Sequence, residues 1–92
     1  MVKIELTKQI TINNNKVKEL NIDFEAVNGN MMLDAEKMAR TKGDTTPQVM
    51  FSQVYALALA SKVCPLSFKE LSELPGKDTQ KIFMAVNDFL FV

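Results

Sequence analysis

The chain lacks most of the residues on which enzyme and metal chemistry usually depend. Its 92 residues contain no histidine and no tryptophan, and Cys64 is the single cysteine. Histidine is the commonest general base and the commonest metal ligand. One thiol cannot form a disulfide within one chain, which fits a reducing compartment. We therefore expect no catalytic residues, no metal site and no cofactor, and a protein that is not an enzyme.

Glycine is scarce and long apolar runs are missing. The three glycines, Gly29, Gly43 and Gly76, stand far apart, so no glycine-rich phosphate-binding loop is present. No apolar run approaches the roughly 18 residues that a membrane-spanning helix needs, and residues 1–5 do not resemble a signal peptide. We expect a cytoplasmic protein that does not bind membranes.

The charges balance, with 11 basic and 11 acidic residues. Binding to nucleic acid usually requires a basic excess or patch, so no nucleic-acid partner is expected. A near-zero net charge also gives little electrostatic protection against self-association, which leaves a homo-oligomer open. Carboxylates that could form an acid–base pair, such as those of Glu70 and Glu73, fall on helix faces expected to be solvated.

Residues 1–23 predict an antiparallel β-hairpin. Apolar residues alternate with polar ones along residues 4–12 and again near Leu20 and Ile22, which is the period of a half-buried strand. Residues 13–15 are three asparagines, which tolerate the backbone angles of a tight turn. Two strands alone are marginal in water, so one face of the hairpin should pack on helices.

Four helices are predicted after the hairpin, two main and two shorter, over residues 30–41, 47–63, 67–73 and 77–90. Asn30 is the expected N-cap of the first and Gly43 its end. Thr46 and Pro47 are the expected cap and first residue of the second. Together with the hairpin they predict a single α+β domain in which the helices pack as a small bundle.

The clearest boundary signals lie in residues 66–78. Ser67 and Glu70 have the spacing of a capping box, and Leu66 and Leu71 have that of a hydrophobic staple. Pro75 disfavours helical geometry in the residue before it, and Gly76 is expected to allow the reversal into the last helix. Such signals specify a packed helical element and supply no reactive group.

The predicted helix over residues 47–63 is apolar almost all round. A helix of this kind is buried on several sides, so it is either the central rod of the fold or partly faces a partner. Cys64, at its end, is expected to be a buried and inert small hydrophobe. Five side chains are candidates for a protein-binding surface, because they give the chain apolar area to spare: Phe51, Tyr55, Leu59, Phe89 and Phe91.

The two C-terminal helices also suggest an alternative, since their length and tight turn resemble a helix-turn-helix. The start of the second helix, residues 77–81, would then face DNA. Its apolar body, the balanced charge and Asp78 near the expected phosphates all argue against this alternative.

The order of these elements resembles the tail assembly chaperones of long-tailed bacteriophages and prophages, in their short form. The resemblance is carried by SFKELSELPGKD and IFMAVNDFL in the C-terminal half, by IELTKQITINNNKVKELNI in the hairpin and by LDAEKMA in the first helix. It covers nearly the whole chain. Two departures fall in loops: Lys8-Gln9 replaces a frequent proline, and Asn13-Asn14-Asn15 replaces a frequent Asn-Gly turn.

This resemblance implies a non-enzymatic function. Members bind the tape measure protein and shield it until the tail tube polymerises around it. A longer, frameshifted form of the same protein recruits the tail tube protein. The resemblance further implies that the chain works in the bacterial host cytoplasm and is absent from the mature virion. The alternative is a small DNA-binding regulator that uses the helix-turn-helix-like pair.

Overall fold

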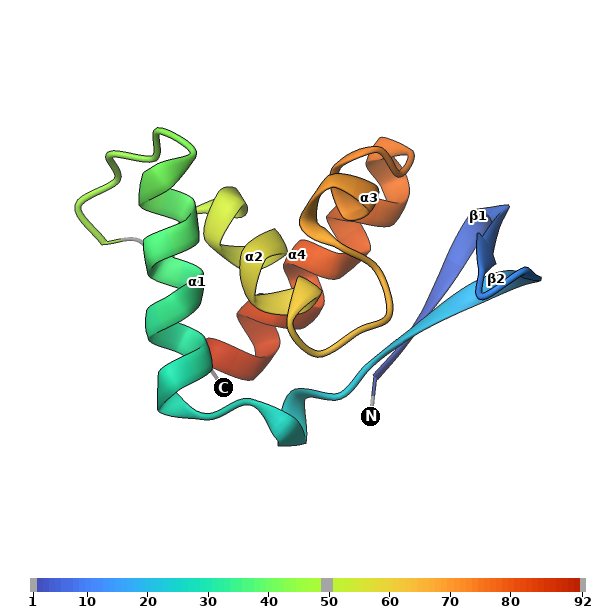
Figure 1. Ribbon diagram of the computed structural model, residues 1–92, viewed down its shortest axis with the longest axis horizontal. Coiled ribbons are helices and arrows are strands. Elements are labelled where there is room, and N and C mark those ends of the chain that lie inside the picture. The colour runs from blue at the N-terminus through green and yellow to red at the C-terminus, as the bar shows by residue number, and fades with distance from the viewer. Residues whose placement is uncertain (1, 49–50, 92) are drawn as a thin grey trace.

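The computed structural model describes residues 2–48 and 51–91. It has the expected α+β architecture, an N-terminal antiparallel hairpin followed by four α-helices (Figure 1). The elements are β1 (Val2–Ile12), β2 (Asn15–Ile22), the short 3-10 helix η1 (Phe24–Ala26), α1 (Gly29–Thr41), α2 (Gln53–Ser61), α3 (Phe68–Ser72) and α4 (Gly76–Phe91). Within residues 2–48 and 51–91, no helix is both long and apolar enough to cross a membrane.

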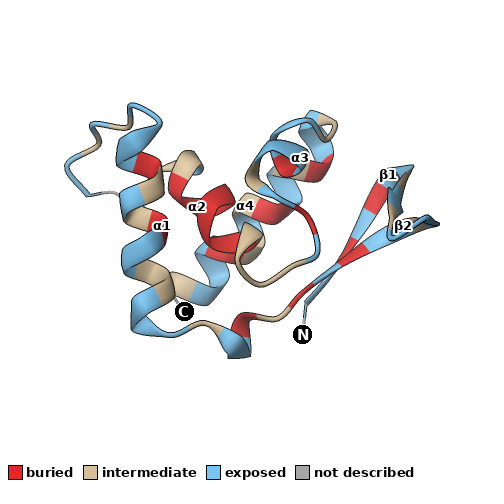
Figure 2. Cartoon of the chain, viewed as in Figure 1, coloured by how far each residue is buried: buried red, intermediate tan, exposed pale blue. Residues whose placement is uncertain are grey.

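Helix α2 is the centre of the helical body, and it packs against α1, α3 and α4. Its six consecutive residues 55–60 are all buried, which Figure 2 shows as a continuous red segment. This confirms the central-rod interpretation of the apolar helix. One buried cluster joins α2 to residues of both strands and of the other helices.

The hairpin turns as its asparagines predict. Asn13 and Asn14 have φ angles of 52° and 67°, and β2 begins directly after them at Asn15. Two positive φ angles at the centre of a two-residue loop match the twist of the flanking strands. The buried side chains Ile4, Leu6 and Leu20 face the core, in agreement with the predicted alternation.

The pairing of β1 and β2 is interrupted half-way along the hairpin. Glu5 pairs with Glu19, but the next pair is Ile10 with Val17, so residues 6–9 of β1 lie opposite Lys18 alone. The interruption turns the Thr7 N–H away from β2 and toward Asp78, in the first turn of α4. Asp78 accepts hydrogen bonds from the Thr7 N–H at 3.1 and 3.2 Å and from the Thr7 hydroxyl at 3.1 Å.

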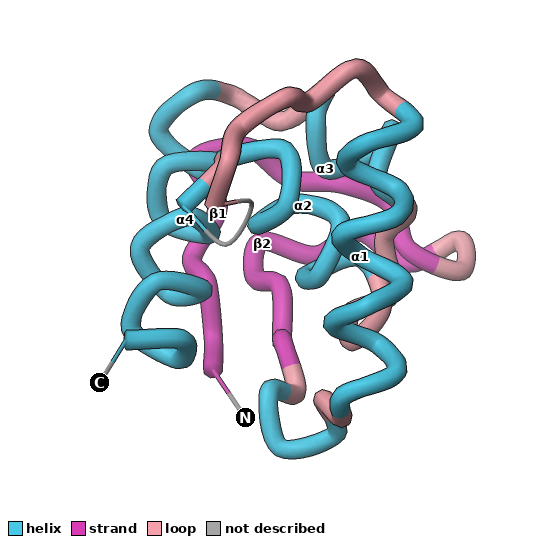
Figure 3. Tube along the Cα trace, turned by 90° about the vertical axis from the view of Figure 1, so that its left-hand side faces the viewer, coloured by secondary structure: helices cyan, strands magenta, loops and turns pink. Residues whose placement is uncertain are grey.

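This contact docks the hairpin on the helical body, and Figure 3 shows β1 running beside α4. Asp78 is completely buried. A buried carboxylate needs hydrogen-bond donors to replace its lost water, and the bulged strand supplies them. The link from Asp78 to Thr7, 71 residues away, was not predicted from the sequence and is a finding of the structure.

Two predicted helix starts were wrong. Helix α1 is capped by Asn28 rather than by Asn30: the Asn28 side chain accepts from the Met31 N–H at 2.9 Å. Asn28 has the extended backbone that a cap requires, and Gly29 is tolerated because it lies at the helix end. The predicted end is confirmed, since Gly43 has a φ of 94° just after the α1 C-cap.

Helix α2 begins at Gln53 and ends at Ser61, and it does not span residues 47–63. Thr46 and Pro47 do not start it, because Asp44 and Arg40 hold Thr46 in a non-helical arrangement beside Ser52. The Asp44 carboxylate accepts from the Thr46 N–H at 2.9 Å and from the Ser52 hydroxyl. The Arg40 guanidinium donates to the Thr46 carbonyl at 2.6 Å. Residues 49 and 50, which the predicted helix included, lie outside the described part of the chain.

Ser52 is the N-cap of α2, and its hydroxyl accepts from the Val54 and Tyr55 N–H groups. At the other end, the Val63 carbonyl accepts from the Asp23 N–H at 3.0 Å. This contact, between the chain after α2 and the chain after β2, uses a carbonyl group that the longer predicted helix would have placed in its last turn.

The C-terminal boundary signals agree with the structure. Ser67 caps α3 by accepting from the Glu70 N–H at 3.2 Å, while the Glu70 carboxylate accepts from the Ser67 N–H at 3.0 Å. Leu66 and Leu71, at the two staple positions, are both buried. Gly76 is the first residue of α4 and its φ is not positive, so the expected reversal at this glycine does not occur.

Candidate protein-binding surface

The structure divides the five residues predicted to form a protein-binding surface. Tyr55 and Leu59 are 3% and 0% exposed on α2, so they belong to the core and the prediction that they form a surface is corrected. Phe51, Phe89 and Phe91 are 61%, 38% and 46% exposed. The difference arises because α2 packs against α1, α3 and α4, whereas the end of α4 is covered on one side alone.

Phe51 is exposed but is not on α2. Phe51, Tyr55 and Leu59 are spaced four residues apart but do not form one row on a helix, because α2 begins two residues after Phe51. The Phe51 ring instead stacks on that of Phe91, with 5.0 Å between ring centroids and 7° between planes. Offset aromatic pairs contribute about 0.5–1.5 kcal/mol beyond the area they bury. The stack therefore holds the chain before α2 against the last turn of α4.

A second stacked pair orients Phe89. Its ring lies 5.1 Å from that of Phe24, at 13° between planes. Phe24 belongs to η1 and is buried. No role was predicted for Phe24 from the sequence, although a large aromatic residue in a short polar segment was an available signal.

Met84 completes the exposed apolar side chains of α4. It is 59% exposed and lies seven residues before Phe91, so both side chains fall on the same stripe of the helix. We call Phe51, Met84, Phe89 and Phe91 the α4 apolar surface. Ile82 and Val86 are buried on the face of α4 opposite Met84 and Phe91. Phe89 lies seven residues after Ile82, at the edge of that buried face, where it stacks on Phe24. Met84 and Phe91 are therefore exposed apolar side chains of α4 additional to those that the core needs.

The chemistry of this surface favours binding to an apolar partner. Asp88 is the single charged residue between Ile82 and Phe91. Exposed aromatic and methionine side chains suit adaptable protein contacts, because the rings are rigid and the thioether can adjust its shape. Exposed apolar side chains concentrated on one element commonly mark an interaction site.

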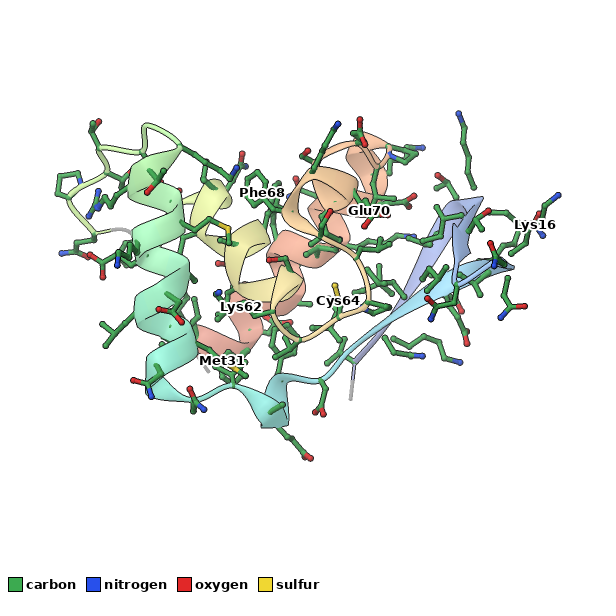
Figure 4. The ribbon with its side chains drawn as sticks, viewed as in Figure 1. Lys16, Met31, Lys62, Cys64, Phe68 and Glu70 are labelled. Atoms are coloured by element: carbon green, nitrogen blue, oxygen red, sulfur yellow. The ribbon has the colours of Figure 1, made fainter. Side chains whose placement is uncertain are left out.

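Reactive groups elsewhere are few and lie in ordinary surroundings. Figure 4 shows Cys64 in the chain that leads from α2 to α3. Its thiol is half-buried, donates to the Leu66 carbonyl at 3.5 Å, and has its pKa raised by burial. Burial likewise raises the pKa of Tyr55. Within the part of the chain that the structure describes, there is neither a pocket nor a group of three possible metal ligands.

Phe68 forms a further contact between elements. The Lys42 ammonium lies over its ring at 4.3 Å from the centroid, which is a cation–π distance. Phe68 is labelled in Figure 4 on the α3 side of the body. The contact joins the end of α1 to the start of α3 and so supports the fold.

The start of α4, which would face DNA in a helix-turn-helix, is partly covered by the hairpin. Asp78 is buried against Thr7, and the Lys81 ammonium donates to the Glu5 carbonyl at 2.7 Å. Lys77, Gln80 and Lys81 are nevertheless exposed. A recognition helix must place its N-terminal residues against base edges, and strand β1 lies close to this end of α4.

Comparison with known proteins gives no further assignment: no family model, no curated protein and no solved structure matches the chain.

Proposed function

We propose that the chain is a non-enzymatic tail assembly chaperone that binds the tape measure protein and shields it during phage tail assembly. The proposal joins the resemblance of the sequence to that family with one structural observation, the α4 apolar surface. A long helical client with exposed apolar faces aggregates unless those faces are covered. A small domain with aromatic side chains held outward can cover them.

The mode of contact follows from the shape of the surface. Met84 and Phe91 lie two turns apart on one stripe of α4, and Phe51 stacks beside Phe91. A client helix would place its own i, i+3, i+4 and i+7 side chains against such a row, as in helix–helix packing. Each contact would be weak, and many copies along one client would act together until tube subunits displace them.

In this proposal the partners are the tape measure protein and a longer, frameshifted form of the chain, which brings the tail tube protein. The site of action is the bacterial host cytoplasm, and the mature virion does not retain the chain. The lack of any activated nucleophile or metal-ligand group among the described residues is compatible with a binding function but does not establish one.

The test is binding of a helical tape measure fragment by two substituted chains. Met84→Ser and Phe91→Ser each remove an exposed apolar side chain, so the fold should persist and binding should weaken. Leu33→Ser is the matched control, because Leu33 is more exposed than Met84 and Phe91 but lies on α1. Isothermal titration calorimetry with circular dichroism on all three variants separates lost binding from lost folding. Full binding by folded Met84→Ser and Phe91→Ser chains would contradict the proposal.

The alternative of a DNA-binding regulator is disfavoured because Asp78 is buried against the hairpin and the Lys81 ammonium donates to the Glu5 carbonyl of β1. A gel shift with duplex DNA at low and moderate salt separates the two functions, because phosphate-driven binding falls steeply with salt. A chaperone should show no shift at moderate salt.

A further inference from the structure

The outward side of α4 carries charges as well as apolar side chains, and they follow one regular row. Met84 and Phe91 belong to the α4 apolar surface, and Lys77, Lys81 and Asp88 lie on the same stripe of the helix. The five positions recur at alternating intervals of four and three residues, which is the spacing of a seam between two packed helices. All five residues are exposed, and we call them the α4 row.

The charges of this row run against the dipole of the helix. Lys77 lies in the first turn of α4, where the dipole favours negative charge, and Asp88 lies in the last turn, where it favours positive charge. The acidic residue of the first turn, Asp78, is buried against Thr7 and lies off the row. Lys77 and Asp88 form no ion pair among the described residues. Local rules of this kind are most often broken at functional sites, so the arrangement indicates that a partner supplies the opposite charges.

Lys77 and Asp88 do not neutralise each other within the helix. Asp88 follows Lys77 by 11 residues, which is about 16 Å along a helix that rises about 1.5 Å per residue. Exposed charges this far apart are largely screened at physiological salt, where the screening length is about 8 Å. A second helix packed along the row would bring its own charges into direct contact with both.

We propose that the α4 row binds a client helix that places an acidic residue beside Lys77, apolar residues against Met84 and Phe91, and a basic residue beside Asp88. This inference rests on the proposed function, because it names the chemistry of the helix that the α4 apolar surface covers. The charges also set the direction of that helix. Helices commonly carry acidic residues in their first turn and basic residues in their last, so a client helix of this ordinary kind lies parallel to α4.

A second copy of α4 matches the row less well than such a client helix. In an antiparallel pair of α4 helices, Lys81 would meet the second copy's Asp88. The Lys81 ammonium, however, already donates to the Glu5 carbonyl at 2.7 Å. Lys77, which has no such acceptor, would meet Phe91 instead of a carboxylate. Nucleic acid is also a poor match, because its phosphates would meet Asp88 and two apolar side chains.

The experiment is binding of synthetic helical peptides, followed by fluorescence anisotropy. The complementary peptide carries glutamate, leucine, lysine and leucine in that order along one face, spaced to meet Lys77, Met84, Asp88 and Phe91. A neutral peptide has glutamine in place of the glutamate and the lysine. The neutral peptide should bind the unsubstituted chain about fivefold more weakly at low salt, because two exposed ion pairs are lost. At about 0.5 M salt the two peptides should bind alike, since the charges are then screened.

Exchange of the two charges in the chain is the second test. Lys77→Glu with Asp88→Lys keeps the net charge and should weaken binding of the complementary peptide about tenfold, since attraction becomes repulsion at both ends. Lys69→Glu with Asp34→Lys is the matched control, because it exchanges the same charges at exposed positions outside the row, and it should leave binding unchanged. Circular dichroism checks the folding of both variants. The neutral peptide needs no substitution in the chain, so its result holds even if a variant does not fold.

A spin label on the complementary peptide measures its direction. With the label at the amino end of the peptide, the amide signals at the start of α4 should broaden in the NMR spectrum of the chain. With the label at the carboxyl end, those at the end of α4 should broaden. Broadening at the opposite ends, or at both ends with either label, would overturn the parallel direction.

The outcomes separate this inference from the proposed function. If the two peptides bind equally tightly at low salt and Met84→Ser weakens both, apolar contact alone recognises the client: the charge match is rejected and helix binding by the α4 apolar surface is retained. If neither peptide binds, both the inference and helix binding by this surface are rejected. If sedimentation shows that the chain alone forms a dimer, and Lys77→Glu with Asp88→Lys dissociates it, the row binds a second copy and the inference is overturned.

Discussion

Helices α2 and α4 are both rich in apolar residues, yet one is enclosed and the other is half open. Six consecutive side chains of α2 are buried, since α1, α3 and α4 surround it. Helix α4 buries Ile82 and Val86 on one side and exposes Met84 and Phe91 on the other. The difference teaches that apolar content alone does not locate a binding surface; the number of neighbouring elements decides which apolar side chains remain available.

Truncation of a side chain on α2 should have the largest effect. Leu59→Ala removes a fully buried side chain between packed helices, so it leaves a cavity as well as a loss of buried area. We expect the free energy of unfolding to fall by about 3 kcal/mol, measured by urea denaturation. A loss under about 1 kcal/mol would mean that α2 is not the enclosed helix described above.

Removal of the carboxylate at the start of α4 should come next. Asp78→Ala removes a fully buried carboxylate that accepts from the Thr7 N–H and hydroxyl, and two such hydrogen bonds together contribute about 1–3 kcal/mol. Hydrogen exchange should show faster opening of β1 than of α2. Asp88→Ala, an exposed aspartate on the same helix, is the matched control and should change neither measurement.

The loop before α2 should make stability depend on acid pH. Hydrogen bonds from Ser52 and Thr46 lower the pKa of Asp44 from 3.8 to about 2. Because the folded pKa lies below the unfolded one, the carboxylate stabilises the fold above about pH 4, and this contribution is lost as the pH falls toward 2. The stability advantage of the unsubstituted chain over Asp44→Asn, measured by thermal unfolding, should therefore shrink across that range. A constant difference would show that the loop contacts do not depend on the charge.

The smallest effect on stability is expected on the open side of α4. Met84→Ala removes a side chain that is already mostly in water, so the free energy of unfolding should change by no more than about 0.5 kcal/mol. Urea denaturation of Met84→Ala and Leu59→Ala under the same conditions compares their free energies of unfolding directly. If the two substitutions cost the same, the contrast between an enclosed α2 and an open α4 fails.

Several local features whose partners lie within a few residues were predicted correctly from the sequence. The Asn13–Asn14 turn, the Ser67–Glu70 capping box and the left-handed Gly43 are of this kind. A cap or a tight turn is set by backbone angles and by hydrogen bonds over three or four residues, so the amino acids themselves specify it. The alternation of the strands and the number of helices were also predictable, because both follow from the spacing of apolar residues within short stretches of sequence.

Competing local signals were harder to rank. Thr46-Pro47 and Ser52 are both good helix starts, and the sequence does not say which one the chain uses. Helix α2 begins after Ser52 because Asp44 and Arg40 bind Thr46 in a non-helical arrangement. Asn28 and Asn30 competed in the same way at the start of α1, and Asn28 became the cap.

The composition and spacing of this chain specify a hairpin, four helices and the capping box of α3, because these depend on contacts between near neighbours in sequence. Long-range packing settled the rest. It buried Tyr55 and Leu59, stacked Phe51 on Phe91, and brought Thr7 to Asp78 across 71 residues. An apolar side chain is equally apolar on every face of a helix, so whether it becomes core or surface depends on which elements fold against it.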